Sequence, residues 1–226
     1  MDIILQSLIN IIQLDDNIIQ IVLLSLYVSI VATISSAFLS IILASHIATK
    51  NFSGKKLVII SSNSLMSLPP VVVGLILYII FSSSGILGLM DLLYTPTIMI
   101  IAQFIIITPI IISLSIKSFS DKFIELNEYL NSMNTSKRKI RNTIIYESRY
   151  DLIIIVITGM SRALSEVGAV IIVGGNIDNI TRVMTTSIVL ETSRGELSLA
   201  LSLGLALIII AILLNIITLF IKNKFL

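Results

Sequence analysis

The sequence predicts an all-α protein that crosses a membrane about five times, and three observations support this fold class. Of the 226 residues, 56% are hydrophobic and 12% are charged, whereas a soluble domain has about 25% charged residues. The mean hydropathy is +1.05. The apolar residues also form runs of about 20 residues, the length that a transmembrane helix needs. A soluble globular domain is therefore excluded.

The expected spans are joined by polar segments. They are Ile18–Ser45, Leu57–Phe81, Thr97–Ile116, Leu152–Val173 and Leu197–Ile221. Pro69 and Pro70 interrupt the second span, and proline removes a backbone donor and clashes with the preceding turn. We expect a kink there, either beside a cavity or as an ordinary packing feature, and a similar kink at Pro109. Met1–Gln13 is apolar but short, so we expect it at the membrane interface or against the bundle; a sixth span there is the less favoured alternative.

The positions of the lysine and arginine residues predict the orientation. If the chain has five spans, 12 of its 15 basic residues lie on one side. These are Lys50, Lys55, Lys56, Lys117, Lys122, Lys137, Arg138, Lys139, Arg141, Arg149, Lys222 and Lys224. Arg182 and Arg194 lie on the other side, and Arg162 lies within a span. Because cytoplasmic loops are enriched in lysine and arginine, the N-terminus is expected outside and the C-terminus in the cytoplasm.

The polar stretch 117–151 is too long and too regular for a simple connection between two spans. Apolar residues recur in it at helical spacing, first at Phe123, Leu126, Leu130 and Met133, then at Ile140, Ile144 and Ile145. Asn134 suits a helix C-cap, and Thr135 or Ser136 can cap a second helix. We therefore expect a helix, a tight turn and a helix that dock on a cytoplasmic partner. The alternative is a solvated basic loop.

One span contains ionisable residues, which are costly in a membrane and by default mark function or an interior pair. Arg162 and Glu166 are four residues apart, so they are expected on one helix face together with Ser165. They either line the translocation path or its gate, or form a structural ion pair. The small residues Ser161, Ser165 and Gly168 also permit a close helix contact, such as a dimer interface.

Polar residues follow the Gly174-Gly175-Asn176 end of this span on the outer side. They are Thr181, Arg182, Thr185, Thr186 and Ser187. Hydroxyls, backbone N–H groups and one arginine can bind a tetrahedral oxyanion. The alternative, which we favour for direct contact, is an ordinary outer loop with a short interfacial helix.

Several classes of protein are disfavoured by what the sequence lacks. It has no cysteine and a single histidine, His46, so disulfides, thiolate chemistry and a histidine-based metal site are not expected. It has no GxxxxGK[ST] phosphate loop, so the chain is not expected to hydrolyse ATP. The spans contain no catalytic cluster, so we expect neither an enzyme nor a bound cofactor, and nothing indicates nucleic-acid binding. A secondary transporter or channel remains as an alternative, although only Glu166 is available as an intramembrane acid.

The stretch around 125–148 resembles the EAA loop of ABC importer permeases. Glu128 falls at the glutamate of that motif and Asn134 at its glycine, while Tyr129 and Leu130 replace the two alanines. Three further segments are similar to the permeases of tungstate-type oxyanion importers. They are SLPPVVVGL (Ser67–Leu75), SRALSEVGAVIIVGGNI (Ser161–Ile177) and TRVMTTSIVLETSRGE (Thr181–Glu196). Tungstate is favoured as the substrate, with molybdate and sulfate as alternatives.

This resemblance implies a type I ABC importer permease-like fold in which residues 1–226 form a single transmembrane permease domain and 117–151 its cytoplasmic coupling loop. It implies three kinds of protein partner: a second copy of the chain, cytoplasmic ATPase subunits that hold ATP and Mg²⁺, and an extracytoplasmic substrate-binding protein. The expected ATPase contacts are Glu128, Met133, Asn134, Thr135, Ser136 and Lys137. The expected binding-protein contacts are Glu191, Arg194 and Glu196. The expected translocation path or gate comprises Arg162, Ser165, Glu166, Pro69 and Pro70.

Overall fold

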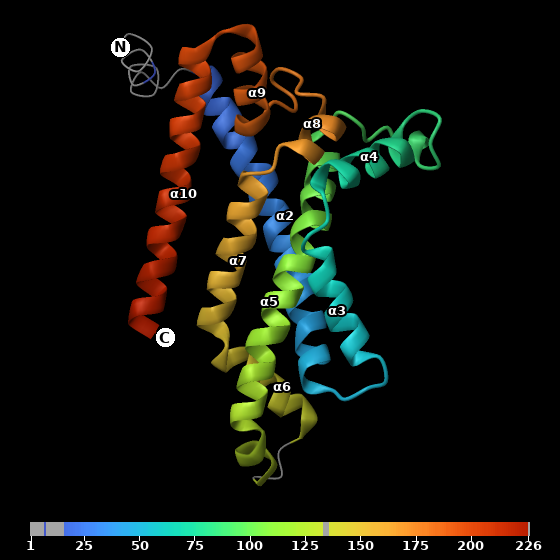
Figure 1. Cartoon of the computed structure of the whole chain (residues 1–226), viewed down its shortest axis with the longest axis vertical. Helices are drawn as coiled ribbons and strands as arrows, with labels where there is room; N and C mark the ends of the chain where they lie inside the picture. The colour runs from blue at the N-terminus through green and yellow to red at the C-terminus, as the bar shows by residue number, and fades with distance from the viewer. Residues whose placement is uncertain (1–6, 8–15, 133–135, 226) are drawn as a thin grey trace.

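The computed structural model describes residue 7 and residues 16–132 and 136–225, with the backbone alone for residues 127, 128, 130, 131 and 225. In these ranges the chain is helical and contains no strand, so the predicted all-α class is confirmed (Figure 1). The elements are α2 (Asp16–Thr49), α3 (Lys55–Leu65), α4 (Pro70–Phe81), the 3₁₀-helix η1 (Gly88–Met90), α5 (Pro96–Ser132), α6 (Lys137–Glu147), α7 (Arg149–Leu164), α8 (Gly168–Gly174), α9 (Met184–Arg194) and α10 (Leu197–Phe225). The prediction for Met1–Gln13 falls almost entirely outside the described residues.

Three continuous helices are long and apolar enough to cross a membrane: Asp16–Thr49, Pro96–Leu126 and Leu197–Lys224. Two further candidates are bent pairs, α3 with α4 at 95° and α7 with α8 at 57°. The described residues therefore provide three spans, or five if each bent pair is one span.

The second predicted span is not a kinked helix, because the chain turns sharply at its two prolines. Helix α3 ends at Leu65, Pro69 is extended (φ −65°, ψ 120°), and Pro70 begins α4. Proline is favoured at the first position of a helix, where its missing N–H has no helical partner to lose. The two prolines therefore start a new helix instead of bending an old one.

The fourth predicted span is also divided, which corrects the expectation that Arg162 and Glu166 share one helix. Helix α7 ends at Leu164, and α8 begins at Gly168. Glu166 lies in the break between them. The two side chains nevertheless pair across the break, at 3.4 Å.

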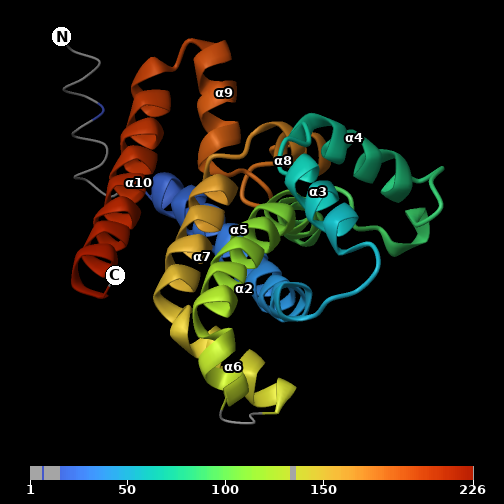
Figure 2. The same cartoon turned by 60° about the horizontal axis from the view of Figure 1, so that its bottom comes forward.

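The third predicted span extends much further than expected. Helix α5 runs without interruption from Pro96 to Ser132, past Lys117, so the first of the two predicted cytoplasmic helices is its continuation. Helix α6, which lies at the lower end of the molecule in Figure 1, packs Ile140 and Ile144 into the same apolar cluster as Phe119. Figure 2 shows this hairpin from below.

The centre of the bundle is the long contact between α2 and α5. The buried face of α2 consists largely of small residues, including Ser25, Ser29, Ala32, Thr33, Ser36, Ala37, Ser40 and Ala44. Small residues let helix backbones approach closely in a membrane, where interhelical hydrogen bonds add to packing. The hydroxyls of Ser36 and Thr108 lie 2.9 Å apart across this contact. Helix α10, in contrast, leaves one apolar face exposed in the single chain, for example at Ile212 and Ile216.

Candidate functional site

The break between α7 and α8 is held together by the buried side chain of Glu166, which is 4% exposed. Its Oε2 lies 3.4 Å from Nη2 of Arg162, at the end of α7. Its Oε1 accepts a hydrogen bond of 3.2 Å from the backbone N–H of Ala169, in the first turn of α8. Its backbone carbonyl accepts a bond of 2.8 Å from the hydroxyl of Thr185, on α9. A carboxylate at a helix N-terminus is stabilised by the free N–H groups there, so one residue connects three helices.

The amide of Gln103 connects α5 to the same break. Its Nε2 donates to the carbonyl of Ala163, in the last turn of α7, at 3.1 Å. Its Oε1 is buried and has no partner among the described residues. A small cavity of about 10 Å³ is lined by Gln103, Glu166, Ser25, Ser29 and Thr185, among others. This polar cluster lies inside an otherwise apolar bundle.

Sequence reasoning missed Gln103, although a signal was present. It is the one amide in the predicted span Thr97–Ile116, and a polar side chain within a span usually faces the bundle interior. Its partners could not be inferred, because the span that supplies them was predicted as one straight helix.

The structure brings the two predicted gate groups together, since the proline turn lies against the α7–α8 break. A Cβ atom built on Gly168 would lie 2.6 Å from Cγ2 of Val71, the residue after Pro70, and 3.6 Å from Oε1 of Glu166. A Cβ atom built on Gly74 would lie 2.7 Å from Cα of Ala169. Glycine at these two positions is what allows α4 and α8 to touch. The exposed Ser165 lies in the same turn as Glu166.

Most of the hydroxyls that were predicted on the outer side form hydrogen bonds within the chain. Thr181 donates to the carbonyl of Gly174 at 2.5 Å, and Thr186 donates to Oδ1 of Asn176 at 2.8 Å. Thr185 is bonded to Glu166. The hydroxyl of Ser187 is buried and without a partner among the described residues. These contacts favour the interpretation of an ordinary connecting loop over a ring of hydroxyls directed at an anion.

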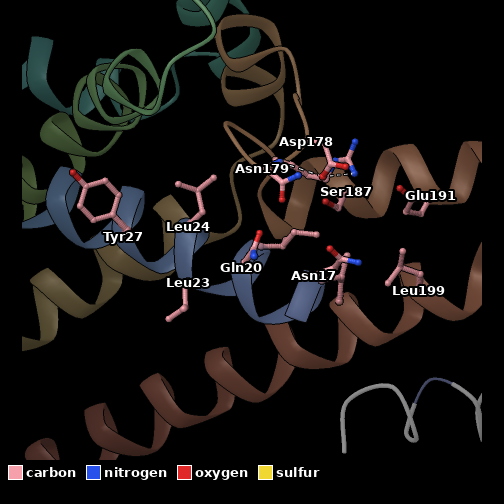
Figure 3. A pocket seen from close by; sticks show the side chains of 13 residues that line it. Asn17, Gln20, Leu23, Leu24, Tyr27, Asp178, Asn179, Ser187, Glu191 and Leu199 are labelled. Carbon is pink, nitrogen blue, oxygen red and sulfur yellow. Dashed lines mark hydrogen bonds and ion pairs between the residues drawn. The ribbon is translucent and has the colours of Figure 1, made fainter. Parts of the chain in front are cut away.

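A pocket of about 520 Å³ lies between the first turns of α2, the turn after α8, α9 and the start of α10 (Figure 3). Its polar lining includes Asn17, Gln20, Asn179 and Ser187. Its charges are compensated: Arg182 pairs with Asp178 at 2.9 Å, and Glu191 pairs with Arg194 at 3.4 Å.

The predicted binding-protein contacts differ in exposure. Glu191 is 5% exposed and faces the pocket. The side chain of Arg194 is 55% exposed, and Glu196 lies at the surface. Of these three residues, only Arg194 and Glu196 therefore have exposed side chains.

Of the predicted ATPase contacts, the structure describes Ser136, Lys137 and the backbone of Glu128, which lie at the facing ends of α5 and α6. Glu128 belongs to the last turns of α5, and its side chain is outside the described atoms. Met133, Asn134 and Thr135 lie outside the described residues. Ser136 is the exposed N-cap position of α6, and the exposed Lys137 is its first residue. The hairpin is braced against α7 by a hydrogen bond of 2.9 Å from Ser118 to Asp151.

No model of a protein family matches the chain, but named relatives cover most of it. It is 42% identical over 201 residues to the tungstate uptake system permease protein TupB of Peptoclostridium acidaminophilum, which covers 89% of this chain and 88% of the relative. It is 42% identical over 171 residues to the protein of the same name from Campylobacter jejuni, with 74% and 70% covered. It is 33% identical over 196 residues to a probable anion ABC transporter permease protein of Haloferax volcanii, with 84% of each chain covered. The helical bundle and these relatives together show that the chain belongs to the family of multi-pass membrane permeases of anion ABC transporters.

Proposed function

We propose that this chain is the permease of an ABC importer that carries tungstate into the cytoplasm, with ATP hydrolysis on a separate subunit. Tungstate is supported as the substrate by the 42% identity, over 89% of the chain, to a tungstate uptake permease. Molybdate and sulfate are the alternatives, since another relative is described only as an anion permease.

The proposed assembly contains two copies of the chain, two ATPase subunits that bind ATP and Mg²⁺, and an extracytoplasmic binding protein. The absence of a GxxxxGK[ST] motif from the sequence supports a separate ATPase. The exposed apolar faces of α4 and α10 support further contacts with lipid or with a second copy. The distribution of lysine and arginine supports a cytoplasmic α6 end, with the N-terminus outside and the C-terminus inside.

The proposed mechanism uses α5 as a lever. The ATPase subunits hold the α5–α6 tip, from Glu128 to Lys137, and move it when they close on ATP. Helix α5 carries this movement from Ser132 to Gln103, about 44 Å at the rise of an α-helix. Gln103 is bonded to the end of α7 beside Glu166, so the movement reaches the place where both bent pairs meet. Opening and closing of the path for the anion would then occur at Pro69–Pro70 and at Arg162–Glu166.

Measurement of cellular tungsten and molybdenum tests the substrate. We would use mass spectrometry on a strain without the gene, the same strain with the gene restored, and a wild-type control, at trace supply of both oxyanions. The expected result is a fall in tungsten alone, with full recovery. A fall in molybdenum alone would replace tungstate by molybdate, and no change in either metal would contradict oxyanion import.

A secondary transporter or channel is the alternative from a different class, and it makes an opposite prediction. The intramembrane acid that an ion-coupled transporter would need is here Glu166, which instead caps α8 and pairs with Arg162. Uptake into vesicles that contain the permease and its ATPase should stop when the catalytic glutamate of the ATPase is replaced. Continued uptake would show that ATP hydrolysis does not drive transport.

A further inference from the structure

We propose that a basic pocket between the end of α2 and the start of α6 binds the headgroup of an anionic phospholipid of the cytoplasmic leaflet. The proposal rests on the proposed orientation, in which the α6 end is cytoplasmic. It does not depend on which anion is transported.

The pocket has a volume of about 610 Å³ and is lined by cations and apolar groups. Its lining consists of Thr49, Lys50, Asn51, Phe52, Phe123, Lys137, Arg138, Ile140 and Arg141. Four of these residues are basic and none is acidic. The four basic residues come from two segments that are far apart in the sequence, the α2–α3 connection and the first turns of α6.

Neighbouring groups show which of the cations are already engaged. Lys55, which lines a neighbouring pocket together with Asn51 and Phe52, donates to the carbonyl of Ala48 at 2.9 Å and so stabilises the end of α2. Nη1 of Arg141 lies 2.6 Å from Nε2 of His46, whose Nδ1 lies 2.8 Å from the carbonyl of Ile42. A carbonyl can only accept, so Nδ1 carries the proton and the neutral ring accepts from Arg141.

The remaining cations of the pocket, Lys50, Lys137 and Arg138, are exposed. Among the side chains that the structure describes, none of the three has a carboxylate within ion-pair distance. Lys137, Arg138 and Lys139 also occupy the first turn of α6. Cations are unfavourable at the positive end of a helix, whereas an anion there is stabilised. The site therefore has uncompensated positive charge, which a bound anion can neutralise.

The position of the pocket along α2 favours a lipid headgroup over a free anion as its ligand. Exposed large apolar residues extend along α2 from Leu23 to Leu43, about 30 Å of helix and the thickness of the hydrocarbon core. Lys50 follows about 10 Å further on, in the headgroup layer. Phe52 is 43% exposed at the rim, and α3 returns toward the bilayer with Leu57 69% exposed. A phosphate can thus meet the cations while its acyl chains follow this apolar surface, and basic pockets of this kind bind anionic headgroups.

Lipid titration of the full-length chain, observed by native mass spectrometry after delipidation, tests the proposal. The probes are phosphatidylglycerol and phosphatidylcholine with the same acyl chains. The test variant is the double substitution Lys50→Gln, Arg138→Gln, which avoids the predicted ATPase contact Lys137. The matched control is Lys222→Gln, Lys224→Gln, which removes the same charge at the C-terminus of α10, on the same side of the membrane.

We expect wild type and control to bind phosphatidylglycerol more tightly than phosphatidylcholine, and the test variant to lose about tenfold in affinity for phosphatidylglycerol alone. Equal losses in both double variants would show non-specific attraction and would overturn the proposal. Displacement of the lipid by millimolar inorganic phosphate would assign the site to a free anion instead. Loss of the bound lipid when the ATPase assembles would assign the surface to the ATPase. Since this readout contains no tungstate, a failed uptake experiment leaves its result unchanged.

Discussion

Helix α5 and the α7–α8 segment were both predicted as single spans, but only the one that contains a proline is continuous. Pro109 lies inside the 37-residue α5, whereas no proline occurs between Arg149 and Gly174 and that segment bends by 57°. In α5, Pro109 has no N–H for the carbonyl of Ile105, and hydroxyls bond the carbonyls on either side: Thr108 donates to Phe104 at 2.5 Å and Ser40 donates to Thr108 at 3.4 Å. Hydroxyl groups and neighbouring helices can satisfy the backbone groups that a proline leaves free.

In the α7–α8 segment the opposite happens, because a side chain competes with the helix for a backbone donor. The Glu166 carboxylate takes the N–H of Ala169 and pairs with Arg162. In this molecule, therefore, the segment with a buried, well-partnered carboxylate is broken, whereas the helix that contains Pro109 is continuous. The molecule thereby contains a continuous helix, α5, beside a broken one, α7–α8, and the following substitutions test that contrast.

The largest effect on uptake is expected from substitution of Glu166, in the break between α7 and α8. Glu166→Ala removes the α8 cap and leaves a buried N–H without its partner, at a cost of about 1–3 kcal/mol in the free energy of unfolding. We expect uptake to fall to background and the melting temperature of the purified permease to drop. Glu166→Gln keeps an acceptor for Ala169 but loses the charge opposite Arg162, so it should have an intermediate effect. Wild-type uptake by the alanine variant would remove Glu166 from the gate.

Glu128→Lys, in the last turns of α5, or Met133→Asp should uncouple ATP hydrolysis from uptake. ATP hydrolysis by the reconstituted complex is expected to continue while uptake fails, with a normal amount of permease in the membrane. The matched control is Glu125→Lys, which makes the same charge change one turn earlier, at a residue that pairs with Lys122 at 2.9 Å. Normal coupled uptake by both test variants would exclude this hairpin tip as the ATPase contact.

Arg162→Ala distinguishes a role of Arg162 in the translocation path from a role in holding the complex together. Its side chain is 41% exposed, so we expect the complex to assemble and uptake to fall roughly tenfold, as for the loss of one charge-assisted hydrogen bond. Size-exclusion chromatography of the complex, together with uptake, measures both quantities. Failure to assemble would instead identify the Arg162–Glu166 pair as structural.

Gly74→Ala tests whether the two bent pairs need their close contact. The new methyl group would lie 2.7 Å from Cα of Ala169, and overpacking against backbone costs about 1–3 kcal/mol. The expected result is a lower melting temperature and a modest loss of uptake. Gly204→Ala is the control, since nothing lies within 4 Å of a Cβ atom there. Equal melting temperatures for the two variants would show that α4 and α8 can separate freely.

The smallest effect is expected for Pro109→Ala. Since α5 is already continuous at this position, restoring the N–H should change uptake by less than about twofold and leave stability equal or slightly higher. Uptake assays on matched membrane preparations measure this. A large loss would mean that α5 bends at Pro109 during transport and is not a stiff lever.

The sequence alone was sufficient for the class of fold, because hydropathy and span length are local quantities. It also located the apolar face of α6: Ile140 and Ile144 are both buried. It did not predict the two breaks, because whether Glu166 leaves the helix depends on donors from α8 and α9 that only the folded chain supplies. For the same reason Gln103 was missed and the burial of Glu191 was not anticipated.

The turn between α3 and α4 has a consequence for hydration. In a helix, each carbonyl accepts from the N–H four residues later, so the carbonyls of Leu65 and Met66 would need donors from Pro69 and Pro70, which have none. Leu65 is compensated by a bond of 3.2 Å from Leu68, but Met66 has no such donor in the helical register. An exposed carbonyl is not tolerated against hydrocarbon. The face of the turn that carries this carbonyl must therefore face water or another protein group, so this side of the α3–α4 turn is closed to the acyl chains of the bilayer.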